Sequence, residues 1–118
     1  MPSHACFLLG FAFLLTHEMD AIRCQEWRIF PVTSTMADEA GYRAFTAVHV
    51  PLYAILLWGL VGDANRGLIV ALDLFFVVHL VLHVFLRHLP TYGFKTAFSW
   101  TLFVGAGLCG ALDLLLAA

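Results

Sequence analysis

The sequence predicts an all-α fold, an integral membrane protein built as an antiparallel four-helix bundle. Of its 118 residues, 62% are hydrophobic and only 12% are charged, and the mean hydropathy is +0.90. A soluble domain of this length cannot bury so much apolar surface. A helix that spans a bilayer needs about 20 predominantly apolar residues, and the chain contains four such segments joined by short connections. We therefore expect one transmembrane domain over residues 1–118.

The first helix is expected over residues 5–29. Its first half is apolar, and its second half becomes polar while keeping a helical pattern. His17, Asp20 and Cys24 follow the i, i+3, i+7 spacing of one helix face. The segment is similar to a secretory signal, but the four residues before it contain no Lys or Arg and no small-residue cleavage site follows it. We expect it to be retained as a transmembrane helix.

The other three helices are expected over residues 40–61, 66–88 and 94–117. Pro51 interrupts the second of them, because proline removes a backbone N–H and leaves the carbonyl of Ala47 without its helical partner. Turn-forming residues separate the helices at positions 31–35, 62–65 and 89–93. Short connections make consecutive helices antiparallel neighbours, which predicts an up-down-up-down order.

The basic residues predict the orientation of the bundle. The first and third connections, with the adjoining helix ends, carry four of them, Arg28, Arg43, Arg87 and Lys95, and the opposite side carries Arg66. Loops rich in Lys and Arg remain in the cytoplasm. We therefore expect a multi-pass protein with both termini outside the cytoplasm.

Four histidines fall at similar depths in the predicted helices. At about 1.5 Å per residue, His17, His49, His79 and His83 all lie in the cytoplasmic half, within roughly two helical turns of one level. An ionisable side chain at the middle of a membrane helix costs about 2.5–3.5 kcal/mol. Because His79 and His83 are spaced i, i+4, both rings lie on one helix face. These observations predict a single shared site inside the membrane.

The donor types in this predicted site suit a zinc or iron ion. The expected metal ligands are His17, Asp20, His49, His79 and His83. Glu18 flanks the same stripe of the first helix and is the expected catalytic base, acting on a metal-bound water whose pKa zinc lowers to about 7. Such an enzyme would take an apolar small-molecule substrate that enters from the lipid bilayer between two helices.

Two other functions are compatible with the same residues. In the first, the protein binds haem b for electron transfer, with two histidines on different helices as axial ligands, such as His49 and His83 or His17 and His79, and the phenylalanines lining a flat pocket. In the second, it is a non-catalytic membrane subunit whose polar residues mediate helix association. For His49 alone, a hydrogen bond to the carbonyl freed by Pro51 is an equal alternative to metal binding. Glu26 is expected to pair with Arg23 at i, i+3.

Other features indicate packing rather than chemistry. The small side chains of the fourth helix form a smooth face for helix packing or for a homo-oligomer: Gly105, Ala106, Gly107 and Gly110. Asp73 and Asp113 fall in the outer half, where they pair with Arg66 or are protonated. The formal net charge of −2 and the lack of a basic patch in the sequence argue against nucleic acid as a partner.

Two resemblances to known proteins accompany these patterns. The stretch His17-Glu18-Met19-Asp20-Ala21, followed by Glu26-Trp27-Arg28, resembles small uncharacterised bacterial membrane proteins with a His–acid motif in the first helix. It is loosely similar to the HxxEE membrane family, although Asp20 and Ala21 stand where that family has two glutamates. This resemblance implies a bacterial cytoplasmic (inner) membrane and no particular activity.

The second resemblance is chemical. The His-x-x-x-His spacing, with a remote His, an Asp and a Ser, is similar to intramembrane zinc hydrolases of the alkaline ceramidase type. Those enzymes contain more helices than this chain. The resemblance implies that Ser99 matches their oxyanion-stabilising serine.

Overall fold

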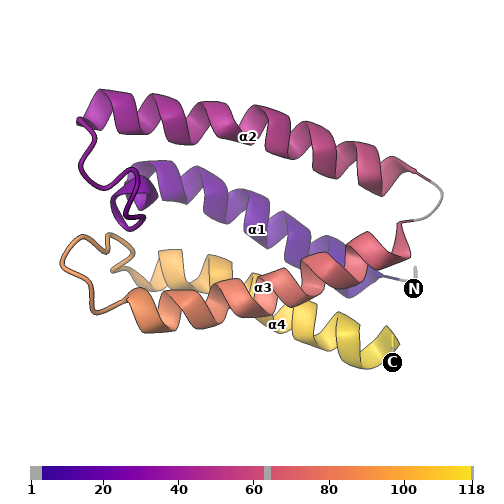
Figure 1. Ribbon diagram of the computed structural model, residues 1–118. Helices are drawn as coiled ribbons and strands as arrows, with labels where there is room; N and C mark the ends of the chain where they lie inside the picture. The colour runs from indigo at the N-terminus through magenta and orange to yellow at the C-terminus, as the bar shows by residue number, and fades with distance from the viewer. Residues whose placement is uncertain (1–3, 63–64, 118) are drawn as a thin grey trace.

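A computed structural model, which describes residues 4–62 and 65–117, contains four long helices that run antiparallel (Figure 1). The elements, in chain order, are α1 (Ala5–Arg23), the 3₁₀ turn η1 (Glu26–Arg28), α2 (Asp38–Val61), α3 (Arg66–Leu86) and α4 (Ala97–Ala117). All four α-helices are long and apolar enough to cross a membrane. The all-helical, four-helix prediction is confirmed, and the predicted ends of α2, α3 and α4 lie within three residues of those observed.

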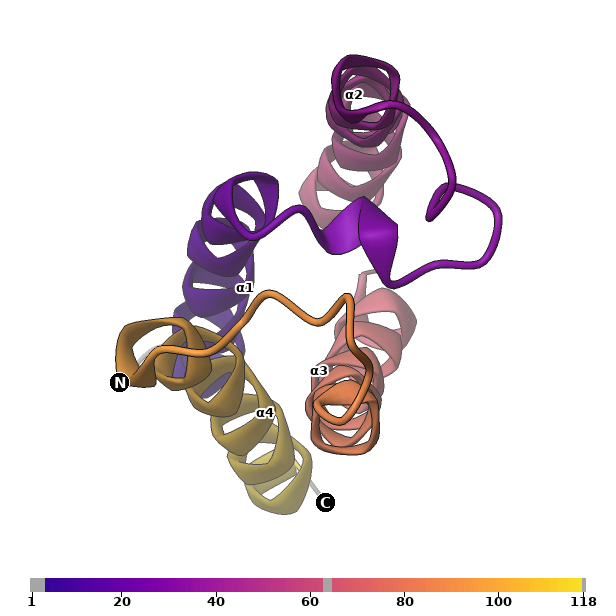
Figure 2. The ribbon, with the colours of Figure 1, turned by 90° about the vertical axis from the view of Figure 1, so that its left-hand side faces the viewer.

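The first helix is shorter than the predicted range 5–29. It ends at Arg23, and Gln25 adopts a left-handed backbone conformation with φ 54°, which an α-helix of L-residues does not contain. After this break the chain forms η1, which turns across the end of the bundle instead of continuing along the axis of α1 (Figure 2). The turn buries Glu26 and Trp27.

Three of the helices form the core. α4 packs along both α1 and α3, whereas α2 makes few contacts with the others and stands apart in the end-on view (Figure 2). Consecutive helices are therefore not all close neighbours, because the main partner of α1 is α4. Small residues on α4 allow this approach: an added Cβ at Gly107 would lie 2.6 Å from Leu80, and one at Gly105 would lie 3.0 Å from Phe13.

The core has two parts along its length. Near the chain ends, stacked rings of Phe7, Phe11 and Phe76 fill the space between α1 and α3. Near the α1–α2 and α3–α4 connections, Phe94 and Phe103 are buried. The polar side chains of the candidate site, described below, lie between these two apolar layers.

Candidate metal site

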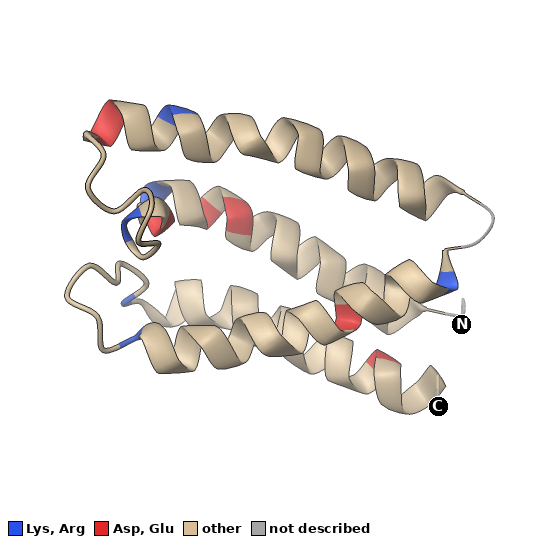
Figure 3. Cartoon of the chain, viewed as in Figure 1, with Lys and Arg blue, Asp and Glu red and all other residues tan. Residues whose placement is uncertain are grey.

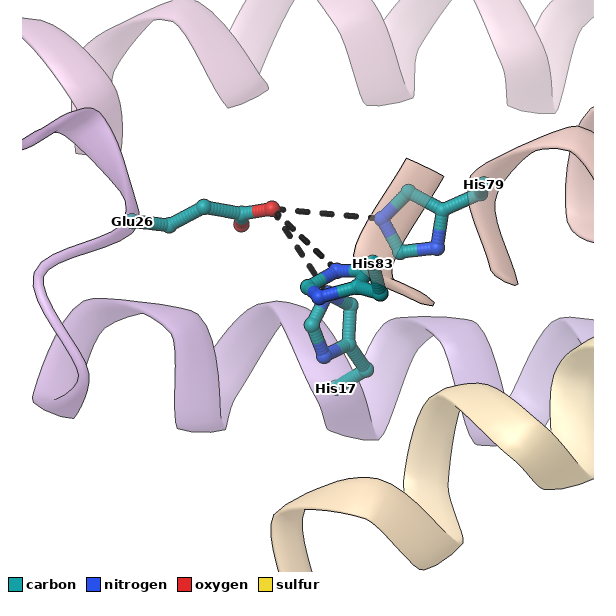
Figure 4. Close-up of side chains that lie close together, drawn as sticks. All are labelled: His17, Glu26, His79 and His83. Atoms are coloured by element: carbon teal, nitrogen blue, oxygen red, sulfur yellow. Dashed lines mark ion pairs between the residues drawn. The ribbon is translucent and has the colours of Figure 1, made fainter. Parts of the chain in front are cut away.

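Four buried side chains converge between α1 and α3 (Figure 4). They are His17 from α1, Glu26 from η1, and His79 and His83 from α3. One ligand atom from each residue lies within 4.8 Å of those of the others. The Oε1 atom of Glu26 is 3.8 Å from Nε2 of His17, 3.9 Å from Nε2 of His79 and 3.7 Å from Nε2 of His83. We call these four residues the His/Glu cluster.

The spacing in the cluster suits a shared ion better than direct hydrogen bonds. Nitrogen and oxygen atoms 3.7–3.9 Å apart are too distant to hydrogen bond. A tetrahedral ion with bonds of 2.0–2.1 Å holds its donor atoms roughly 3.4 Å apart. The distances to the carboxylate oxygen are close to this value, and all four ligand atoms lie within 4.8 Å of one another, so the side chains would draw closer together to bind one ion.

The buried nitrogen atoms of two histidines give a second indication of a bound ion. His17 is fully buried, and neither of its ring nitrogens has a hydrogen-bond partner among the described residues. The same holds for Nδ1 of His79. A buried polar atom without a partner costs about 1–3 kcal/mol. A metal–nitrogen bond would offset part of this cost for His17.

His83 is held in one orientation by its neighbours. Its ring stacks on Phe103 with centroids 3.9 Å apart, and its Nδ1 lies 2.7 Å from the hydroxyl of Tyr92. Burial raises the pKa of Tyr92, so the phenol remains protonated at neutral pH. Metal-binding histidines commonly use their second nitrogen in such a contact, which fixes the ring and its tautomer.

Glu26 brings the negative charge of the cluster. Burial by itself raises the pKa of a carboxyl group, but the imidazoles of His17 and His79 outweigh burial here and lower the pKa of Glu26 to about 2. The carboxylate is therefore ionised at neutral pH. One carboxylate and three imidazoles are donors typical of zinc and iron sites.

The cluster includes three of the five predicted metal ligands, His17, His79 and His83. The other two lie elsewhere. Nε2 of His49 is 2.6 Å from Oε2 of Glu18, and its Nδ1 is 2.6 Å from the carbonyl oxygen of Phe45.

Asp20 interacts within its own helix. It accepts a long hydrogen bond from the Cys24 thiol at 3.7 Å and lies 3.9 Å from Arg23.

The residues expected in other roles are also separated from the cluster. Glu18, the expected catalytic base, pairs with His49. Because both nitrogens of His49 are engaged, the structure does not present His49 and His83 as a pair of axial haem ligands. Ser99 is buried and accepts a hydrogen bond from Thr96. The carbonyl bonded by His49 is that of Phe45, not the Ala47 carbonyl that Pro51 leaves free.

Glu26 is the cluster member that the sequence reasoning assigned another role, as a partner of Arg23. On a helix continued through residue 29, Glu26 would lie one turn beyond Arg23. The left-handed Gln25 redirects it, and no Gly, Pro or Asn marks that position in the sequence. The local sequence therefore carries no signal for the inward turn.

The chain belongs to the family described as "Family of unknown function (DUF6713)", which matches residues 3–118. No curated protein and no solved structure matches the chain. The family match spans all three elements that build the His/Glu cluster, α1, η1 and α3.

Proposed function

We propose that this member of the DUF6713 family is an integral membrane protein that binds a transition-metal ion, zinc or iron, through His17, Glu26, His79 and His83. One observation carries the proposal: three imidazole Nε2 atoms surround a single carboxylate oxygen at 3.7–3.9 Å in a buried position. In a bilayer these groups would be costly without a bound partner.

The identity of the metal decides the role of the site. A zinc ion bound by all four side chains has complete tetrahedral coordination, which is the pattern of structural zinc sites. An iron(II) ion accepts more ligands and retains open positions, which is the pattern of oxygen-activating sites with histidine and carboxylate ligands. In the zinc case, the ion would join α1, η1 and α3 and stabilise the bundle.

We further propose that the site lies in the cytoplasmic half of a bacterial inner membrane. Arg23, Arg28, Arg43, Arg87 and Lys95 fall in or near the α1–α2 and α3–α4 connections, and basic residues gather at that end of the bundle (Figure 3). Basic connections remain on the cytoplasmic side. The described chain ends, at residues 4 and 117, lie at the opposite end (Figure 1) and would face outward.

Metal analysis of the purified protein tests the proposal. The full chain is purified in detergent without an affinity tag containing histidine, and its metals are quantified by mass spectrometry. We expect about one zinc or iron ion per chain, and loss of that ion in His17→Ala, Glu26→Gln and the double variant His79→Ala/His83→Ala. His49→Ala is the matched control, because it removes a membrane histidine outside the cluster and should retain the ion.

Two results would overturn the proposal. One is a metal-free wild-type protein that also fails to take up zinc or iron(II) during titration. The other is equal metal content in the cluster variants and in His49→Ala. Circular dichroism and gel filtration show whether each variant retains the helical fold, and a Soret band in the visible spectrum would indicate haem instead.

A further inference from the structure

A second polar pair lies between α1 and α2, outside the His/Glu cluster. Oε2 of Glu18 is 2.6 Å from Nε2 of His49, and the two side chains are 17% and 16% exposed. Both residues fall within helices long and apolar enough to cross a membrane. The proposed metal site leaves this pair without a role.

The hydrogen bonds of the pair fix its net charge. Nδ1 of His49 lies 2.6 Å from the carbonyl oxygen of Phe45, and a carbonyl only accepts, so this nitrogen carries a proton. The short contact between Nε2 and Glu18 then needs one more proton, placed on either atom. In both placements the pair is neutral overall, and among the described residues only Oε2 of Glu18 is hydrogen bonded, which leaves Oε1 as an acceptor.

Other polar groups face the same space. A cavity of about 270 Å³ is lined by Glu18, His49, Thr46 and Tyr53 together with apolar side chains. The hydroxyl oxygen of Thr46 is buried and has no hydrogen-bond partner among the described residues. The ring of Tyr53 lies 5.4 Å from that of His49. The cavity is thus lined by a carboxylate acceptor from α1 and by hydroxyl groups from α2.

Apolar space continues from this polar end. Two further cavities share Tyr53 with the first: one of about 300 Å³ between α1 and α2, and one of about 180 Å³ that also reaches Leu72 and Phe75 of α3. Their walls are almost entirely apolar and include Phe11, Leu15 and Leu56. Because α2 packs loosely against the core, this crevice is reached from the side of the bundle. Its size falls in the range of small-molecule sites.

We propose that the crevice between α1 and α2 binds a neutral amphiphile with a hydroxyl head group and an apolar tail. The hydroxyl would donate to Oε1 of Glu18 and accept from the hydroxyl of Thr46, and the tail would occupy the apolar cavities. A charged head group is disfavoured, because the Glu18–His49 pair is already neutral and an extra charge would be uncompensated in a low-dielectric setting. A quinol and a lipid alcohol share this chemistry. The inference does not depend on metal binding.

Photolabelling tests the assignment. The full chain is reconstituted in nanodiscs and labelled with a long-chain alcohol that carries a diazirine in its tail, and labelled residues are located by peptide mass spectrometry. We expect labels on α1 and α2 at the cavity walls, and on the order of tenfold weaker labelling in Thr46→Val and Glu18→Leu, since each removes one hydrogen-bonding group that faces the head group. Thr101→Val is the matched control, because Thr101 is exposed on α4 and its hydroxyl donates to the carbonyl of Ala97 in the same helix.

Competition identifies the source of the hydroxyl. Unlabelled decyl hydroquinone and a monoacylglycerol of equal chain length compete with the probe, beside decane and decanoate. The proposal is supported if either hydroxyl compound competes better than decane and decanoate, and the better of the two identifies the class of ligand. Equal competition by the hydroquinone and the monoacylglycerol would show that the site recognises the hydroxyl group on either compound. Equal labelling by the alcohol and by a diazirine alkane, or labelling unchanged in both variants, would overturn the proposal. The crevice would then be occupied by bulk lipid.

Metal content measured in the same samples separates the two proposals. Thr46→Val and Glu18→Leu should retain the metal while losing the label. His17→Ala should lose the metal while retaining the label. If one of these two results is not observed, only the proposal that predicts it is overturned.

Discussion

The hydroxyl of Tyr92 lies 2.7 Å from Nδ1 of His83, and Nε2 of the same ring lies 3.7 Å from Glu26. Tyr92 belongs to the connection before α4, so the contact joins that connection to α3. If Nδ1 donates its proton to the phenol oxygen, the lone pair of Nε2 faces the carboxylate. This is the tautomer that a metal ion at the cluster requires.

Tyr92→Phe should therefore weaken metal binding without removing a ligand. Loss of such an outer contact typically costs 10–100-fold in metal affinity, and we expect a decrease of this size. Affinity is measured by competition with a chelator of known strength. Tyr53→Phe is the control, because Tyr53 belongs to α2 and lines the crevice outside the cluster. Unchanged affinity in Tyr92→Phe would show that the contact does not orient His83 for a metal.

Acidification should release the metal through the imidazoles and not through Glu26. Protons compete with the ion for histidine nitrogens, whose ordinary pKa is about 6.5, so affinity should fall as the pH decreases from 8 to 4. Glu26, with a pKa lowered to about 2, remains ionised over this range and adds no proton uptake. Titration of bound metal against pH should show uptake of more than one proton per ion released, and affinity independent of pH down to 4 would contradict histidine ligation.

The sequence predicted the histidines of the cluster for physical reasons that hold in three dimensions. His79 and His83 share a face because of their spacing, and His17 reaches the same depth on an antiparallel helix. The depth of a residue in the membrane does not specify which helices lie side by side, however. His49 has a similar predicted depth, yet α2 stands apart from the core, and His49 pairs with Glu18 instead.

Glu26, in contrast, joins the cluster although local sequence patterns do not predict it. Its place in the cluster depends on the left-handed conformation of Gln25, which no turn-forming residue in the sequence indicates. The burial of Trp27 in this turn, and an indole contact so close to Gly41 that an added Cβ would lie 2.4 Å from Nε1, are tertiary features. Local sequence patterns therefore predict a longer helix here, because contacts with α2 and with the α3–α4 connection at Gly93 accompany the reversal.

Asp113 is expected to stabilise the first turn of α1 from a distance. Its Oδ1 accepts a hydrogen bond from the backbone N–H of Phe7 at 3.2 Å, and His4 at the N-cap makes no side-chain capping bond. The first N–H groups of a helix have no partner within it. Asp113→Ala should therefore lower the free energy of unfolding by about 0.5–2 kcal/mol, the usual effect of losing a cap.

Unfolding of the purified protein by SDS in mixed micelles measures this change. Asp113→Asn is the informative control, because its amide oxygen can still accept from Phe7, and it should retain most of the stability. Equal destabilisation by both substitutions would assign the effect to the charge of Asp113 and not to its hydrogen bond.

The close approach of α3 and α4 at Gly110 provides a test of the core. A Cβ added at Gly110 would lie 2.8 Å from the carbonyl oxygen of Asp73 and 3.1 Å from Cβ of Phe76, and backbone cannot move aside without separating the helices. Gly110→Ala should cost about 1–3 kcal/mol in the SDS unfolding assay. It should also weaken metal binding, since α3 carries His79 and His83.

Gly67→Ala is the matched substitution on α3, because an added Cβ there meets nothing within 4 Å. Alanine restricts the unfolded chain more than glycine does, which favours folding by about 0.4–1 kcal/mol where the backbone permits it. The two substitutions make the same chemical change in helices, so opposite signs isolate helix contact as the cause. Destabilisation of similar size in both would instead mean that α3 and α4 do not approach each other at Gly110 as closely as the structure places them.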